Sequence, residues 1–271
     1  MSKLFKHLYG RPEGTTARNL FLAFMTIGTL HSASAQNIYS TGFEKPAFVA
    51  GASLAGQDGW IAPPPLSPDA ATIVAVKKAG QSVRVEGADL EHQDFINDAT
   101  LGYYDAIGSY RHAVNYDTGG TQTVRISVDV RLTGRETPKS NFFSASVGAI
   151  GVDDEGGASG IGELAISSDG HVYGYSGQDL VPTFLTSAHV ALGTWHNLAI
   201  EVDFAERTYS FYVDDDLLGT FDFDPSASTN ILRRGSLITY AAPDTKKDKK
   251  ADHTASYDNF SIEVVSDEAA E

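Results

Sequence analysis

GTWHNLAIEVDFAERTYSFYVDD, residues 193–215, holds two alternating runs of residues joined by a short turn. In the first run every second position is apolar, and these positions are Leu198, Ile200, Val202 and Phe204. A period of two is typical of a strand that buries one face and exposes the other. With Ala205-Glu206 as the bend, the stretch predicts a β-hairpin whose apolar positions face a core.

Similar strand-like runs recur along the chain, and no convincing amphipathic helix interrupts them. Residues 121–130 alternate cleanly, with Val124, Ile126, Val128 and Val130 on one face. Further runs cover residues 141–150, 162–168, 171–175, 217–223, 235–240 and 256–264. Short strands at this spacing predict an all-β fold, a two-sheet antiparallel sandwich or a barrel.

The first 35 residues have the features of an export signal. Basic residues precede an apolar run, Leu20–Leu30, and Ala33-Ser34-Ala35 gives the small-residue pattern that signal peptidases accept. Eleven residues are too short to cross a bilayer core of about 30 Å as a helix. We therefore expect cleavage before Gln36, one domain over residues 36–271, and a secreted, periplasmic or cell-surface location. An N-terminal membrane anchor is the alternative.

Composition narrows the classes of partner. The formal net charge is −15 over 271 residues, and the chain has no cysteine. Nucleic acids and anionic membranes are poor partners for such a polyanion, because phosphate binding needs clustered Lys and Arg. Without disulfides, an exported domain of this length depends on its hydrophobic core, to which a structural metal ion adds.

The hairpin and the two ends of the chain resemble one superfamily. Gly193-Thr194-Trp195-His196 followed by Tyr212-Val213-Asp214 resembles the middle hairpin of the concanavalin A-like (laminin G-like) jelly roll. Gly42-Phe43-Glu44, Gly56-Gln57-Asp58-Gly59-Trp60 and Tyr257-Asp258-Asn259-Phe260 resemble the opening and closing strands of exported members. The resemblance implies an antiparallel jelly-roll sandwich and a buried Trp195. It does not decide the function, because lectins, binding modules, glycosidases and lyases share this fold.

One acidic motif raises the question of catalysis. Glu201, Asp203 and Glu206 have the E-x-D-x-x-E spacing of the glucanases in this superfamily, but in those enzymes the motif lies on a separate strand before the hairpin. Here Glu201 and Asp203 alternate with buried positions, and Glu206 belongs to the turn. A retaining glycosidase needs two carboxyls about 5–5.5 Å apart. We therefore interpret the motif as sheet polarity and expect no catalytic residue; a hydrolase using these three residues is the alternative.

Aromatic residues outside the hairpin are the candidate ligand contacts, because their rings stack on the apolar faces of sugars. We name Trp60, Tyr103, Tyr104, Tyr110 and Arg111 as the candidate binding residues. Core packing of these aromatics is the competing interpretation. A cluster of Tyr, Arg and His at residues 110–112 also matches the residue types used by some jelly-roll lyases.

A structural calcium ion is the only cofactor that the sequence suggests. In sandwich modules with this opening and closing, the resemblance implies that Glu44 and Asp258 lie on adjacent strands and share an ion. Calcium prefers hard oxygen ligands of this type. The alternative is that both are edge carboxylates bonded to backbone N–H groups.

The sequence thus favours an exported lectin-like jelly roll that binds polysaccharide or a cell-surface glycan without catalysis. The alternatives are a glycoside hydrolase or polysaccharide lyase on the same scaffold, and a structural surface protein without a specific ligand.

Overall fold

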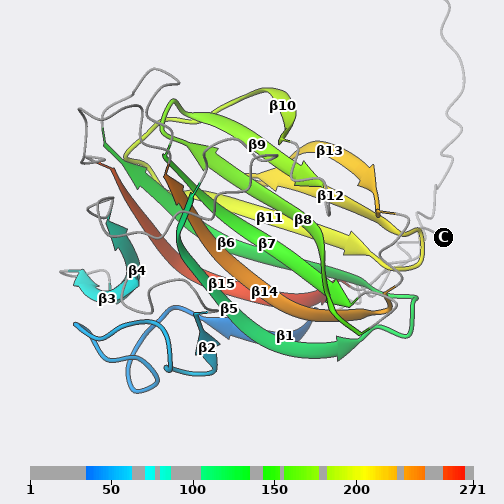
Figure 1. Ribbon diagram of the computed structural model, residues 1–271, viewed down its shortest axis with the longest axis horizontal. Helices are drawn as coiled ribbons and strands as arrows, with labels where there is room; N and C mark the ends of the chain where they lie inside the picture. The colour runs from blue at the N-terminus through cyan, green and yellow to red at the C-terminus, as the bar shows by residue number, and fades with distance from the viewer. Residues whose placement is uncertain are drawn as a thin grey trace, which may run out of the picture. The chain divides into compact units, whose positions relative to one another are not determined.

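A computed structural model of the chain describes residues 35–62, 71–76, 80–86, 105–134, 143–152, 156–176, 182–224, 229–241 and 253–265. Strands dominate these residues, which belong to one compact unit (Figure 1). The predicted export signal lies outside them. None of the described segments contains a helix long and apolar enough to cross a membrane.

Fifteen strands among the described residues form two antiparallel sheets. Sheet A has the order β13 (Asp216–Asp222), β12 (Thr208–Val213), β11 (His196–Asp203), β6 (Thr123–Thr133), β15 (Thr254–Val265), β4 (Gly80–Glu86) and β3 (Ala71–Val76), with β1 (Gln36–Thr41) also pairing with β15. Sheet B has the order β10 (Pro182–His189), β9 (His171–Ser176), β8 (Ala158–Ser167), β7 (Phe143–Val152), β14 (Ile231–Ala241), β5 (Asp105–Asp117) and β2 (Trp60–Ile61). The two sheets form a sandwich, so the predicted fold class is confirmed.

The alternating pattern of the hairpin decides which side chains fill the core. Strands β11 and β12 pair with Ile200 opposite Phe211, and β11 also pairs with β6, where Ile200 lies opposite Ile126. All three side chains are buried. The polar positions between them consequently form the outer face of sheet A.

The first and last described strands pair in sheet A, as the resemblance implied. Strand β1 pairs antiparallel with the last strand, placing Thr41 opposite Phe260. Figure 1 shows the blue β1 beside the red β15. This pairing brings the segment that begins at Gly42 next to the Asp258-Asn259 bulge of β15.

Candidate functional site

The three carboxylates of the E-x-D-x-x-E motif do not converge. Glu201 points away from the core and forms an ion pair with Arg125, at 2.8 Å between Oε1 and Nη1. Asp203 accepts hydrogen bonds from the backbone N–H groups of Ala205 and Glu206, each at 2.9 Å, and so holds the turn. Glu206 itself is exposed in that turn. The predicted side-chain parity is confirmed, and no pair in the motif has the geometry of a retaining glycosidase.

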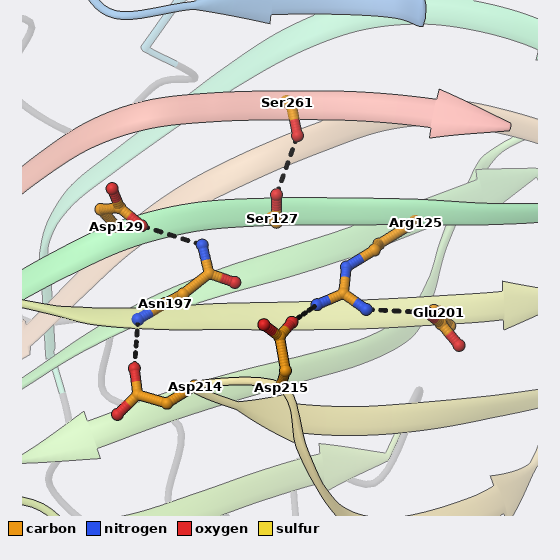
Figure 2. A network of polar contacts seen from close by, with 8 residues as sticks. All are labelled: Arg125, Ser127, Asp129, Asn197, Glu201, Asp214, Asp215 and Ser261. Atoms are coloured by element: carbon orange, nitrogen blue, oxygen red, sulfur yellow. Dashed lines mark hydrogen bonds and ion pairs between the residues drawn. The ribbon is translucent and has the colours of Figure 1, made fainter. Parts of the chain in front are cut away.

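Glu201 belongs to a polar network on the outer face of sheet A (Figure 2). Arg125 bridges Glu201 and Asp215, while the Asn197 amide donates to Asp129 at 2.9 Å. A shallow depression of about 550 Å³ lies over this network and is lined by Ala35, Arg125, Asn197, Glu201, Asp215, Glu263 and Val265. In Figure 2 Arg125 pairs with Glu201 and Asp215, while Asp129 and Asp214 accept hydrogen bonds from Asn197, so each drawn carboxylate has a partner within the protein.

Replacing Glu201 with glutamine is therefore expected to leave any glycan-related binding or activity intact. The Arg125–Glu201 ion pair is partly buried, with side chains 17% and 23% exposed, and glutamine keeps a hydrogen bond to Arg125, so the expected loss of stability is about 1 kcal/mol. Binding assays and thermal denaturation of E201Q check this. A loss of activity by several orders of magnitude would instead support a hydrolase centred on this motif.

Two of the predicted ligand aromatics are core residues. Trp60 is 0% exposed and donates its indole N–H to the Tyr39 hydroxyl at 3.1 Å. Tyr110 is 1% exposed, and its hydroxyl accepts a hydrogen bond from the backbone N–H of Ala71 at 2.6 Å. Neither ring presents a face to a ligand, which corrects the sequence-based interpretation of both. The sequence around Trp60 and Tyr110 suggested loops. In the structure the two residues belong to β2 and β5, and both side chains point into the core.

Of the other candidates, Tyr103 and Tyr104 lie outside the described residues. Arg111 is described, and it is half-buried on β5. Trp195, which the resemblance implied to be buried, is 39% exposed.

The predicted calcium ligands are neighbours, but each has a backbone partner. Glu44 Oε1 accepts a hydrogen bond from the N–H of Gln81 at 2.6 Å, and Asp258 Oδ1 accepts one from the N–H of Asn259 at 2.8 Å. Within the described segments no group of three or more His, Cys, Asp or Glu side chains is arranged to hold a metal ion. The alternative set out from the sequence, edge carboxylates bonded to backbone, accounts for both residues, and calcium binding stays a prediction.

The ionisation of Asp258 offers a test of this arrangement. Burial, with Asp129 and Glu44 nearby, raises its pKa from 3.8 to about 6. The folded chain therefore binds this proton more readily than the unfolded chain, so stability falls as the pH rises from about 4 through about 6. We expect Asp258→Asn to raise the melting temperature at about pH 8 and to make no difference at about pH 4. Melting curves with a chelator and with added calcium provide the second arm: a calcium-dependent gain in wild type that D258N lacks would establish an ion here.

The outer face of sheet B carries a different arrangement. Phe143, Ala145 and Val147 of β7 point into the core, so the residues between them face outward. One outward row crosses four adjacent strands in register, and its members are Glu163 (β8), Gly148 (β7), Ser236 (β14) and Arg111 (β5). At about 4.8 Å per strand, the Cα atoms of Glu163 and Arg111 are about 14 Å apart, with only small side chains between them.

Residue 148, in the middle of this row, has no space for a side chain. A Cβ atom at Gly148 would lie 2.5 Å from the Ser236 hydroxyl, which itself donates to the Gly148 carbonyl at 3.2 Å. Even alanine at residue 148 would therefore displace the serine. The strip between Glu163 and Arg111 therefore consists of small residues, and Ser236 on it is 0% exposed.

Two arginines flank the strip, and no carboxylate among the described residues forms an ion pair with either of them. Arg111 lies next to Arg234, and burial followed by the charge of Arg234 lowers the pKa of Arg111. Burial, followed by Arg233, likewise lowers the pKa of Arg234. The ion pairs between described residues include neither Arg111 nor Arg234. The Nε of Arg111 is buried without a hydrogen-bond partner. In a chain of net charge −15, this arrangement favours an external anion.

At the other end of the row, Glu163 is 9% exposed, and burial raises its pKa from 4.5 to about 7. Its Oε2 accepts a hydrogen bond from the Tyr240 hydroxyl at 3.1 Å, and Ser146 Oγ lies 2.5 Å from its Oε1. Ser146 Oγ also lies 3.1 Å from the Ile238 carbonyl, but its hydroxyl has a single proton to donate. When Glu163 is protonated it donates to Ser146, which then donates to Ile238, so the neutral carboxyl satisfies every group in this set.

Sequence reasoning named Arg111 but missed Arg234, Glu163 and Tyr240. An available signal was the stretch ASGIGELAIS, residues 158–167, where a single acidic residue interrupts small and apolar neighbours. Such an isolated carboxyl in a strand that reads as buried is a candidate for a perturbed pKa.

Comparison with known proteins identifies structures of similar fold but no related sequence. No protein-family model and no curated protein sequence matches the chain. A solved alginate lyase from Aplysia kurodai is similar with a TM-score of 0.55 and 12% identity, covering 84% of this chain and 99% of that one. This chain has a jelly-roll fold.

Two further structures support the same fold. The carbohydrate esterase of the Shiga toxin-encoding bacteriophage phi24B has a TM-score of 0.53 and 13% identity, covering 86% of this chain and 100% of that one. The endo-β-1,4-glucuronan lyase of the fungus Trichoderma reesei has a TM-score of 0.51 and 11% identity, covering 84% and 95%. At these identities the jelly roll relates the proteins by architecture alone.

Proposed function

We propose that this jelly roll is an exported protein that binds an acidic polysaccharide on the outer face of sheet B, with Arg111 and Arg234 contacting carboxylates of the glycan. The observation that carries the proposal is the pair of neighbouring, partly desolvated guanidiniums without an acidic partner among the described residues. Holding two such cations together costs stability unless an anion joins them. Guanidinium forks bind carboxylates in a bidentate manner.

The ligand class follows from the surroundings of the two arginines. The neighbouring positions Gly148 and Ser236 carry no long side chain, and the Tyr240 hydroxyl, which is bonded to Glu163, would be the hydrogen-bonding group for a sugar hydroxyl. A glucuronan lyase and an alginate lyase are among the solved structures of the same fold, which agrees with a glycan as ligand. The overall negative charge of the chain repels polyanions, so binding here requires direct contacts rather than general attraction.

The proposal is tested by screening the protein against an array of acidic and neutral glycans. Binding confined to glycans that carry carboxylates is the expected result. Binding that is strongest to neutral glycans, or no binding to any acidic member, would contradict it.

An acid–base enzyme on the same face is the second candidate, favoured by the hydrogen bond between Tyr240 and Glu163. A carboxyl with a pKa of about 7 is near the optimum for proton transfer at neutral pH, and a phenol bonded to it shares that proton network. Glycan-active enzymes of either type, hydrolase or lyase, need such a pair near the scissile bond. The pair lies on the strip that the proposed ligand would occupy.

Replacing Glu163 with glutamine separates the two candidates. If the protein is an enzyme, we expect wild type to release products from the bound glycan with a pH limb near 7, and E163Q to lose at least about 100-fold of that rate. If it is a binding protein, neither variant releases products and both bind. E201Q is the matched control, because the same chemical change on sheet A leaves the Glu163–Tyr240 pair untouched.

A further inference from the structure

The outer face of sheet A has an exposed aromatic residue with a cation placed against its ring. Trp195, just before β11, is 39% exposed, and the guanidinium carbon of Arg131 lies 4.8 Å from the ring centroid. The Nε of Arg131 is buried without a hydrogen-bond partner. This pair lies beside the network of Figure 2, whose Asp214 bonds His196, and on the other sheet from Arg111 and Arg234.

Trp195 is held in place by its neighbours along the chain. The N–H of Gly193 donates to the Leu132 carbonyl at 2.8 Å. The imidazole of His196 lies 2.7 Å from both the Thr194 hydroxyl and an Asp214 carboxylate oxygen. Because these bonds hold the residues on either side of Trp195, its backbone loses less conformational entropy when the ring binds a ligand.

A second cation lies on the same face. Arg131 of β6 pairs with Ser256 of β15, and Ser256 pairs on its other side with Arg84 of β4. The two arginines are therefore two strand spacings, about 9.6 Å, apart at their Cα atoms with a serine between them. The nearest carboxylate on this face along β6, Asp129, already accepts hydrogen bonds from Asn197 and Asn259. Trp195, Arg131, Ser256 and Arg84 make a strip of aromatic and basic character in an acidic protein.

We propose that Trp195 and Arg131 form a second binding site for a carboxylated sugar, on the outer face of sheet A. The indole ring packs against the apolar face of the sugar ring, and Arg131 takes the carboxylate, with Arg84 in reach of the next one along the polymer. The choice of an acidic sugar rests on the proposed function. Because the outer faces of the two sheets of a sandwich point in opposite directions, a domain with both sites bridges two polysaccharide chains.

The chain's tryptophan content makes the second site directly observable. There are only two tryptophans, and Trp60 is 0% exposed, so acrylamide quenches mainly Trp195. With short oligogalacturonides as the probe, we expect the quenching constant to fall to roughly half. Maltooligosaccharides of the same length, which lack carboxylates, should give no protection. The absence of protection by oligogalacturonides overturns the second site.

Variants separate this site from the one on sheet B. Arg131→Gln should abolish the protection, whereas Arg207→Gln should not, although Arg207 also lies over an aromatic ring, 5.3 Å from the centroid of Phe223. In a variant with both Arg111→Gln and Arg234→Gln, protection of Trp195 should persist even if sheet B binds nothing. If protection disappears in that double variant, the Trp195 signal reports sheet B indirectly and the second site is refuted.

Crosslinking of two polysaccharide chains by one domain can be measured directly. Wild-type protein mixed with long polygalacturonate should increase light scattering through crosslinking, at protein concentrations where Trp195→Ala and the Arg111/Arg234 double variant do not. Equal scattering by wild type and Trp195→Ala would rule out bridging through this site.

Discussion

In a protein that already carries Arg131→Gln, so that sheet B keeps the only proposed site, replacing Arg111 and Arg234 together with glutamine is expected to weaken binding of acidic oligosaccharides by at least about 100-fold. A hydrogen bond to a charged group contributes about 1.5–3 kcal/mol, and about 1.4 kcal/mol corresponds to a factor of ten, so the loss of two such contacts is large. The melting temperature should stay the same or rise, because the substitution removes the repulsion between Arg111 and Arg234. Calorimetric titration and thermal denaturation of the same preparations measure the two effects.

The opposite behaviour is expected of Arg125, which provides the control. Arg125 has carboxylate partners at 2.8 Å on two sides, so Arg125→Gln should lower stability slightly and leave affinity unchanged. Unchanged affinity in the Arg111/Arg234 variant would place the binding face elsewhere. A marked loss of stability in that variant would mean that these arginines have partners that stabilise the fold.

Replacing Trp60 with alanine is expected to destabilise the domain by about 3–5 kcal/mol, a large fraction of the stability of most domains. The ring is fully buried and packs against Phe43 and Phe260, with centroids at 5.8 and 5.1 Å. Its removal leaves a cavity and takes away the hydrogen-bond donor to Tyr39.

Denaturant titration measures the cost, and Trp195→Ala is the matched control. Trp195 is partly exposed, so its truncation should cost much less stability than that of Trp60. If Trp60→Ala instead kept normal stability and lost glycan binding, Trp60 would be a ligand residue as the sequence first suggested.

The sequence predicted the parts of the fold in which one face of a strand is buried and the other is polar. Strands β6, β11 and β12 were predicted because Val124, Ile126 and Leu198 mark every second position and polar residues lie between them. Strands β3, β4 and β5 were not predicted. In β5 the pairing with β14 is shifted twice, so apolar residues do not keep a strict period of two.

The site was less accessible to sequence reasoning than the fold. Arg111 could be singled out, but its neighbour Arg234 follows more than 100 residues later, and only the register of β14 on β5 brings the two together. The alternation of side chains along β8 predicts that Glu163 faces outward. It does not predict that the outer face of sheet B is buried at this residue. The raised pKa of Glu163 is a consequence of tertiary packing, which no local pattern contains.

Trp195 illustrates the limit of a resemblance. The hairpin motif was correct in outline, and its strands have the expected pairing. The resemblance nevertheless implied a buried ring, whereas the chain places Arg131 against the indole and leaves it partly exposed. Contacts made by a single residue depend on its neighbours in this chain and not on the superfamily's fold.

The central claim is that the outer face of sheet B recognises carboxylates on a glycan. Calorimetric titration of the Arg131→Gln protein, in which sheet B keeps the only proposed site, with an oligogalacturonide and with the methyl ester of the same oligosaccharide tests it most directly, because the two ligands differ only in the charged group. We predict that the acid binds and that esterification weakens binding by at least about tenfold, in the presence of an intact Arg111–Arg234 pair. Equal affinity for the two ligands, or binding of the ester alone, would contradict the account.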